Sequence, residues 1–276
     1  MVVKSGFLGL LMRKLRAIGG LRHLGLTGFF LFAFETLRQT FFPGKKPFGL
    51  RSKNARFRLL CRPNTSDFTV FRHVFIKRQY GCLDRVERPK FILDCGANIG
   101  YSAAYFLTQF PEAVLTAVEP DADNCAILEA NLCPFAGRYR VVRAAIWPHE
   151  TGLTWDETPY RDGREWARVV RSVKPGEVPL VTGTTISALM RESQAERISI
   201  LKMDIERSEL ALFSENFEEW LDKVDNLAIE LHDLECASVF NSAIANQDFK
   251  ITRFGELTIC QRSGREVAFI LPPLKR

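Results

Sequence analysis

The chain has 276 residues, of which 46% are hydrophobic and 25% are charged. This composition is typical of a globular protein with a substantial core, and it excludes collagen, coiled coils and intrinsically disordered chains. The net charge is +6, so a class of partner can be inferred only from how the charge is distributed.

The positive charge is concentrated in the segment 1–60. It contains twelve Lys or Arg side chains and a single acid, Glu35, which gives +11. The segment 61–276 holds 26 basic and 31 acidic side chains and carries −5. A basic segment of this kind indicates an anionic partner, either lipid headgroups or nucleic acid.

Two apolar stretches make up most of the segment 1–40. Apolar residues between Leu8 and Ile18 recur at helical spacing among basic residues, which predicts an amphipathic helix. The apolar run over 24–34 has eleven residues, whereas a helix needs about 20 to span a bilayer. Three interpretations remain open for residues 1–40: packing on the protein's own core, peripheral contact with a membrane surface, or an organelle transit peptide.

Residues 43–56 are predicted to be a polar connector. We therefore divide the chain into a basic and apolar helical extension, residues 1–55, and a second domain, residues 56–276. The seven cysteines form no C-x-x-C pair and no Cys/His cluster at zinc spacing, which argues against a disulfide framework or a zinc finger. A reducing compartment, the cytoplasm, is the expected location.

From residue 91 onward, apolar strands alternate with helices of about a dozen residues. The predicted strands are 91–96, 113–120, 139–147, 199–206 and 226–233, and the predicted helices are 99–110, 123–132, 184–192, 208–217 and 236–247. This alternation is typical of a doubly wound α/β fold, a Rossmann-like and mostly parallel sheet with helices on both faces. Residues 148–180 are expected to form a hairpin or loop insertion near the sheet edge. The segments 249–262 and 266–272 are expected to form an antiparallel C-terminal hairpin.

The first strand runs into the sequence Asp94-Cys95-Gly96-Ala97-Asn98-Ile99-Gly100. Gly96 and Gly100 would let backbone N–H groups and a helix N-terminus approach a ligand, and the carboxylate of Asp94 suits a cationic amine. Glu119 ends the second strand, where an acid can accept both hydroxyl groups of a ribose. Together these residues predict a nucleoside-binding site.

The glycine spacing disfavours a dinucleotide. A G-x-G-x-x-G loop would need glycine at two positions where this chain has Asn98 and Tyr101. The loop and the acid that follows it resemble instead the pattern of class I S-adenosylmethionine-dependent methyltransferases.

Acidic residues also follow the fourth and fifth apolar runs. Asp204 and Glu206 alternate at the end of one strand, so they are predicted to share a face, and Glu230 and His232 repeat this spacing. Ligands of open parallel sheets bind at the carboxyl ends of the strands. We therefore expect all four side chains to border the same crevice as the glycine loop.

These segments together resemble the FkbM family of methyltransferases over about residues 60–260. The resembling segments are the loop from Asp94 to Gly100, Val118-Glu119-Pro120, Leu201 to Glu206 with Glu209, Ile229 to His232, and the stretch from Thr65 to Phe75. The resemblance implies that the cofactor is S-adenosylmethionine and that it is held by Asp94, Gly96, Asn98, Gly100 and Glu119. It also implies that Asp204 and Glu206 belong to the active-site wall.

The chain departs from the family pattern after Glu206. Arg207 and Ser208 replace a glycine and its neighbour. Two interpretations of Arg207 stay open: it binds an anionic acceptor, or it is a solvated turn residue.

The expected activity is O-methylation of a hydroxyl group on a sugar, glycolipid or other small metabolite. Asp204 or His232 would remove the acceptor's proton, and Glu206 and Glu230 complete the predicted catalytic group. The same acids could hold Mg²⁺, but we assign no metal. A nucleotide-dependent oxidoreductase and a noncatalytic nucleoside- or membrane-binding module are the alternatives. Nucleic acid is disfavoured because the basic residues accompany apolar ones without an aromatic-rich groove.

Overall fold

A computed structural model describes residues 21–42, 44–157 and 168–262. The chain forms two compact units, Met1–Arg78 and Gln79–Arg276. The predicted boundary after residue 55 falls inside the first unit. The helix predicted over 8–18 lies outside the described residues.

The N-terminal unit contains a long helix and a short two-stranded sheet. Its elements are α2 (Leu21–Phe41), β1 (Phe48–Leu50), β2 (Leu59–Cys61), α3 (Asp67–Phe71) and the π-helix η1 (Arg72–Ile76). α2 is interrupted at Gly25, whose φ of 71° is open to glycine at no steric cost. The apolar run predicted over 24–34 is thus part of a longer helix. Of the helices in the described ranges, none is long and apolar enough to cross a membrane.

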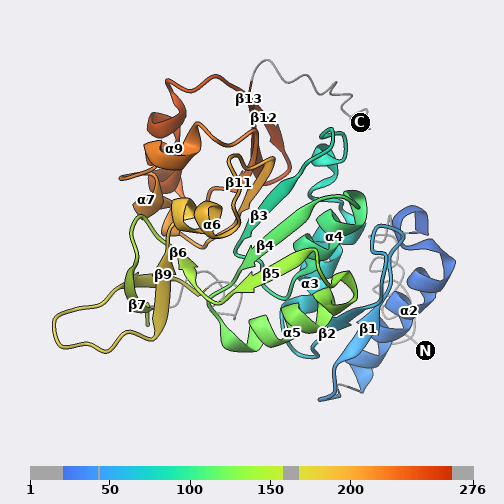
Figure 1. The fold of residues 1–276 in the computed structure, drawn as a ribbon. Helices are drawn as coiled ribbons and strands as arrows, with labels where there is room; N and C mark the ends of the chain where they lie inside the picture. The colour runs from blue at the N-terminus through green and yellow to red at the C-terminus, as the bar shows by residue number, and fades with distance from the viewer. Residues whose placement is uncertain (1–20, 43, 158–167, 263–276) are drawn as a thin grey trace. The chain divides into compact units, whose positions relative to one another are not determined.

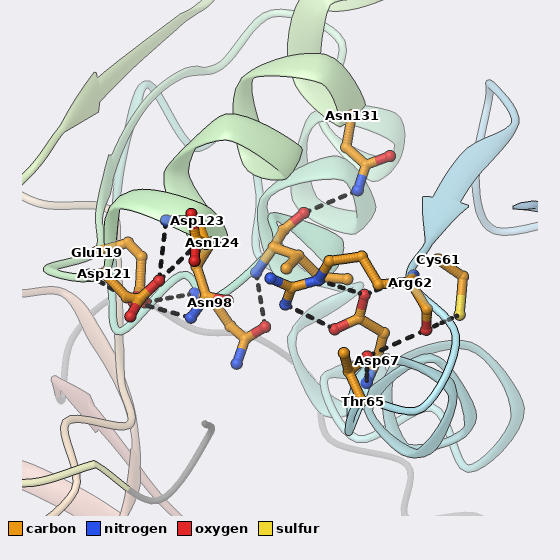
Figure 2. A network of polar contacts seen from close by, with 11 residues as sticks. Cys61, Arg62, Thr65, Asp67, Asn98, Glu119, Asp121, Asp123, Asn124 and Asn131 are labelled. Carbon is orange, nitrogen blue, oxygen red and sulfur yellow. Dashed lines mark hydrogen bonds and ion pairs between the residues drawn. The ribbon is translucent and has the colours of Figure 1, made fainter. Parts of the chain in front are cut away.

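The predicted polar connector over 43–56 is wrong at its centre. β1 lies there, is fully buried, and pairs antiparallel with β2, with Phe48 opposite Cys61. The chain after β2 is fixed by Asp67, a buried carboxylate that Arg62 contacts through two side-chain nitrogens over 2.9 and 3.0 Å (Figure 2). The backbone N–H of Arg62 also donates to this carboxylate over 2.7 Å. These charge-assisted hydrogen bonds hold the loop that leads into α3.

The C-terminal unit is built on a seven-stranded sheet with the order β12-β13-β11-β10-β3-β4-β5 (Figure 1). Its parallel strands are β3 (Phe91–Cys95), β4 (Val114–Val118), β5 (Tyr139–Val142), β10 (Ile200–Met203) and β11 (Asn226–Glu230). The helices between and after them are α4 (Tyr101–Gln109), α5 (Ala122–Leu132), α6 (Ile186–Glu192), α7 (Ser208–Leu212), α8 (Glu218–Leu221) and α9 (Leu234–Ile244). This arrangement confirms the predicted doubly wound α/β fold.

One core cluster of this unit lies between the sheet and the helices of its second half. Leu93 of β3 and Leu201 of β10 belong to one buried apolar cluster with Leu189 of α6 and Phe240 of α9. β3 is buried along its whole length. A central strand covered on both faces has no solvent-facing side, which is why β3 begins with three apolar residues and its one charged residue, Asp94, is buried.

The strand predicted over 139–147 is broken after Val142. β5 ends there, the chain bends at Ala144, and β6 (Ala145–Ile146) joins a separate sheet of order β6-β9-β7-β8. The other strands of that sheet are β7 (Thr151–Trp155), β8 (Val170–Ser172) and β9 (Val181–Thr184). β7 and β8 pair antiparallel, so the hairpin predicted within 148–180 is confirmed.

An antiparallel hairpin at the edge of the main sheet is confirmed, but its strands differ from those predicted. Both β12 (Phe249–Phe254) and β13 (Leu257–Arg262) come from the segment predicted as one strand. Gly255 has a φ of 63°, as a glycine at the first position of a two-residue hairpin turn can adopt. The second predicted strand, 266–272, lies outside the described residues.

Candidate active site

The strand order places the candidate site at the middle of the main sheet. β3 and β10 are adjacent and parallel, with Cys95 opposite Met203 at their carboxyl ends. β4 lies on the far side of β3 and β11 on the far side of β10. Doubly wound sheets bind ligands at such a switch point. The loop that carries the predicted cofactor residues therefore lies beside the loop that carries the predicted acids.

Gly96 is the point at which the two loops touch. Its φ is 74°, and a Cβ atom in its place would collide with the carbonyl oxygen of Asp204. The backbone N–H of Asp204 donates to the carbonyl oxygen of Cys95 over 3.1 Å. The lack of a side chain at Gly96 is thus required by packing between the loops, and not only by the approach of a ligand.

The rest of the glycine loop contains two residues with left-handed backbone conformations. Asn98 has a φ of 50°, and Gly100, the N-cap of α4, has a φ of 83°. The side-chain oxygen of Asn98 accepts the backbone N–H of Ile99 over 2.7 Å, a local bond that suits asparagine to this conformation. A Cβ atom at Gly100 would lie 3.1 Å from Cγ of Leu128, so this glycine also allows α4 and α5 to approach.

Glu119 follows β4 and is almost completely buried. Its Oε2 accepts the backbone N–H of Asn98 over 2.9 Å, and its Oε1 accepts N–H groups of Asp121 and Asn124 over 3.1 Å each (Figure 2). Burial raises the pKa of this carboxyl group, and the hydrogen bonds oppose that rise. A carboxylate oxygen can accept two hydrogen bonds. Counting donors among the described residues, Oε2 therefore has an acceptor position left for a ligand hydroxyl group.

Asp94 forms an ion pair with Lys202 of the same chain. Lys202 stands opposite Asp94 in the register of β3 and β10, and its Nζ lies 3.2 Å from Oδ1 of the carboxylate. Ser102 of α4 donates to Oδ2 over 2.6 Å. Burial alone would lower the pKa of Lys202, but the nearby acidic groups, Asp94 first among them, together raise it, so Lys202 is a cation. Asp94 therefore already has a cationic partner within the chain.

Sequence reasoning missed Lys202 and Tyr80. Lys202 also donates to the carbonyl oxygens of Cys95 and Gly96, so it fixes the start of the glycine loop. Its signal in the sequence is a lone charge inside an apolar strand, which implies a buried partner. Tyr80 is buried beside the same charges, and burial raises the pKa of its phenol. Tyr80 precedes the first parallel strand, and nothing in the sequence there indicates that it lies beside Asp94 and Lys202.

The predicted acids surround a buried histidine. The side chain of His232 is 0% exposed, with Nδ1 3.0 Å from Glu209 and Nε2 3.3 Å from both Asp204 and Glu206. Burial lowers the pKa of His232, but the three carboxylates around its ring raise it well above its usual value. His232 is therefore an imidazolium cation at neutral pH. Of the two predicted bases, Asp204 is the one able to accept a proton.

The carboxylates converge through a loop rather than along a strand. β10 ends one residue before Asp204, and Glu206 and Arg207 have φ angles of 46° and 71°. The prediction that Asp204 and Glu206 share a strand face is therefore wrong, although both reach the same imidazole nitrogen. The loop is closed by the buried Glu209, whose Oε1 also accepts the backbone N–H of Ile205 over 3.2 Å.

Arg207 has a left-handed backbone conformation. A residue with a side chain adopts it at a cost of roughly 1–2 kcal/mol, whereas glycine would adopt it without strain. Its guanidinium lies 2.6 Å from Asp233 and 2.9 Å from Glu235, at the start of α9. Its charge is thus matched by two acids of the same chain. Neither interpretation drawn from the sequence included this role.

Glu230 ends β11 and is half-buried. One atom each from Asp204, Glu230 and His232 lie within 4.8 Å of one another, a set that could hold a cation. Ligation through the histidine would first require removal of the proton that the carboxylates stabilise. We refer to Asp204, Glu206, Glu209, Glu230 and His232 as the acid–histidine cluster.

Replacing Lys202 with Met should leave the Asp94 carboxylate buried without its cation. We expect the free energy of unfolding to fall by about 3–5 kcal/mol, as measured by urea denaturation of the full chain. The double variant Lys202→Met/Asp94→Asn is the matched control, because it removes both charges and should recover most of the loss. A double variant as unstable as Lys202→Met would show that the ion pair is not the cause.

The imidazolium of His232 should make stability depend on pH above neutrality. A group with a raised folded pKa contributes stability that is fully present below its unfolded pKa, about 6.5 for histidine, and is lost as the pH rises toward the folded pKa. We expect the free energy of unfolding to decline above pH ~6.5 by up to ~1.4 kcal/mol per pH unit. His232→Gln should remove this slope.

Urea denaturation at several pH values between about 7 and 9 measures the slope. The control is His149→Gln, since His149 is an exposed histidine and its replacement should leave the slope of the wild type. Equal slopes in His232→Gln and in the wild type would contradict the assignment of a buried cation.

The candidate site lies within a stretch of the chain that matches a known protein family. A sequence model of the methyltransferase FkbM domain matches residues 94–251, more than half of the chain. The matched segment begins at Asp94 and contains the glycine loop, Glu119 and the whole acid–histidine cluster.

Individual relatives are more distant. The chain is 26% identical over 194 residues to methyltransferase sdnD of Sordaria araneosa, a match that covers 58% of this chain and 73% of the relative. It is 25% identical over 227 residues to the AMB antimetabolite synthetase AmbE of Pseudomonas aeruginosa, which covers 70% of this chain but only 11% of that protein. A crystal structure of methyltransferase FkbM from Methylobacillus flagellatus is 17% identical with a TM-score of 0.44, covering 63% of this chain and 43% of its own. By its domain match, the chain belongs to the FkbM family of methyltransferases.

Proposed function

We propose that this methyltransferase uses S-adenosylmethionine to methylate a hydroxyl group of a sugar, glycolipid or other small metabolite. Family membership identifies the chain as a methyltransferase and implies the methyl donor. It leaves the oxidoreductase alternative without support. The observation that carries the proposal is that the glycine loop, tied to the buried carboxylate of Glu119, lies directly against the loop of the acid–histidine cluster.

The glycine loop fits a nucleoside. Glu119 is oriented by three N–H groups and has an acceptor position at Oε2 that suits a ribose hydroxyl. Asn98 is tied to Glu119 through its backbone, so the cofactor residues of the loop form one connected unit. Asp94 is neutralised by Lys202. It therefore acts by fixing the loop, and not as a free charge offered to the cofactor.

The acid–histidine cluster fits a positively charged ligand group. In the part of the chain that the structure describes, three of its carboxylates contact one imidazolium, and Glu230 lies close to two of these groups. Carboxylates gathered in this way favour a cation as ligand. When bound, S-adenosylmethionine supplies a methyl group on a positively charged sulfur, a strong electrophile.

Asp204 is the group that we assign to take the acceptor's proton. Its side chain is 30% exposed, compared with 15% for Glu206 and 0% for Glu209. It can accept a hydrogen bond from the acceptor hydroxyl and take its proton as the oxygen becomes more acidic. His232 holds Asp204 in place through an ion pair over 3.3 Å. Glu230 lies in the same set and would help to orient the acceptor.

The cofactor assignment is tested by titrating S-adenosylhomocysteine into the full chain by calorimetry. We expect the wild type to bind and Glu119→Ala to bind at least about tenfold more weakly, because a charge-assisted hydrogen bond to the ligand is lost. Glu129→Ala, which replaces an exposed acid on the neighbouring α5, is the control and should bind like the wild type.

Glu119→Ala also removes the acceptor for three N–H groups, so its folding is checked by thermal unfolding. Glu119→Gln preserves the shape of the side chain and should bind with intermediate affinity. A folded wild-type protein that binds no S-adenosylhomocysteine would overturn the assignment.

The assignment of Asp204 is tested by methyl transfer from radiolabelled S-adenosylmethionine to a pool of sugar and glycolipid acceptors. We expect Asp204→Asn to lower kcat by about 100-fold or more, the usual contribution of a general base. The affinity for S-adenosylhomocysteine should change little. Asp222→Asn, an exposed aspartate distant in the sequence, is the control. Turnover by Asp204→Asn equal to that of the wild type would remove Asp204 from the mechanism.

A further inference from the structure

Helix α2 of the N-terminal unit carries large apolar side chains on two opposite faces. One face is buried and includes the apolar side chains of Leu24 and Phe32, together with Gly28 and Glu35. The residues two positions further along, about 200° around the helix, are exposed. We call this second face the outer stripe of α2, and its members and exposed fractions are Leu26 (69%), Phe30 (67%), Phe34 (59%), Leu37 (37%) and Phe41 (49%). They follow one another at intervals of three or four positions, so they form one continuous row.

The buried face accounts for the packing of α2 within its own unit. The ring of Phe32 stacks on that of Phe68 with centroids 4.4 Å apart. Glu35 is buried and binds Arg38 over 2.7 Å. A Cβ atom at Gly28 would collide with the backbone of a following loop. The helix is therefore seated through this face, and the outer stripe is not needed to hold it there.

A helix on the surface of a globular protein normally has charged and polar residues on its outer face. The outer stripe has three phenylalanines and two leucines instead. A contiguous exposed apolar patch of this kind marks a site of interaction with a protein or a membrane.

The charges around the outer stripe favour a lipid surface. The stripe runs at its C-terminal end into Phe42, which is 77% exposed, and then into the exposed pair Lys45 and Lys46. The segment 1–60 carries +11, and its single acid, Glu35, is buried and paired. Apolar rings next to lysines are the composition of a helix that lies in a membrane interface.

We propose that α2 docks the protein on a bilayer that contains anionic lipids. The outer stripe enters the boundary between headgroups and acyl chains, and the basic residues of the N-terminal segment contact the lipid phosphates. The helix lies in the plane of the interface, because no described helix is long and apolar enough to span the membrane.

Two other occupants fit the charges less well. A second copy of the chain would bring another +11 segment to the same face, and the two segments would repel each other. A nucleic acid would match the basic residues, but its phosphate backbone offers nothing apolar to cover the row of aromatic rings.

The test is sedimentation of the full chain with vesicles of phosphatidylcholine and about one third phosphatidylglycerol. We expect the wild type to sediment, and we expect Phe30→Ser/Phe34→Ser to lower its partition coefficient by at least about tenfold. The matched control is Val178→Ser/Leu180→Ser, because these residues are 73% and 65% exposed but lie in the C-terminal unit. This control should bind like the wild type.

The charge contribution is measured separately with Lys45→Gln/Lys46→Gln. We expect binding to the anionic vesicles to fall by about tenfold or more, since each cation near such a surface is worth about 1 kcal/mol, or about fivefold. Binding to pure phosphatidylcholine should be weak and unaffected by this change. Circular dichroism and S-adenosylhomocysteine binding check that each variant is folded.

Three results would overturn the proposal: a wild type that does not sediment, a Phe30→Ser/Phe34→Ser variant that partitions like the wild type, or equal binding to both kinds of vesicle. Light scattering identifies the main competing explanation. If the wild type is a dimer that Phe30→Ser/Phe34→Ser converts to a monomer, the outer stripe covers a second copy and the proposal fails. Because vesicle binding is measured without an acceptor, these outcomes are independent of the proposed methyl transfer.

Discussion

The buried ion pair between Asp94 and Lys202 is the contact on which the rest of the candidate site depends. It joins the parallel strands β3 and β10 at the point where the strand order reverses, and Lys202 also binds two carbonyl oxygens at the start of the glycine loop. A buried pair of this kind adds little to stability compared with apolar side chains of the same volume. Its effect is geometric, because it fixes the register in which Gly96 meets the backbone of Asp204.

A second buried cation, His232, offsets the charge repulsion among the carboxylates of the acid–histidine cluster. Four carboxylates in a partly buried group would repel one another. The imidazolium of His232, held by Glu209 on one nitrogen and by Asp204 and Glu206 on the other, offsets this repulsion. A protonated histidine thus balances part of the negative charge around Asp204, the proposed proton acceptor.

The parts of the fold that follow from local pattern can be predicted from the sequence, and the parts that depend on distant contacts cannot. Asp94 and Glu119 can be identified because they end apolar runs, and strand ends of a parallel sheet converge. The pairing with Lys202 depends on the register between two strands that are far apart in the chain. The break in the segment 139–147 depends on a second sheet, and the conformation of Arg207 depends on acids that follow β11.

The two parts of the chain carry net charges of opposite sign. This difference explains why membrane docking would need both an apolar stripe and a basic segment. The segment 61–276 carries −5, so an anionic surface repels it, whereas the segment 1–60 carries +11 and outweighs that repulsion. Electrostatic attraction decays over about 8 Å at physiological salt. It therefore brings the chain to the membrane surface but does not insert it into the interface. Burial of aromatic rings supplies the short-range part. An enzyme held at a membrane meets amphiphilic acceptors at a raised local concentration, which among the proposed acceptors favours a glycolipid.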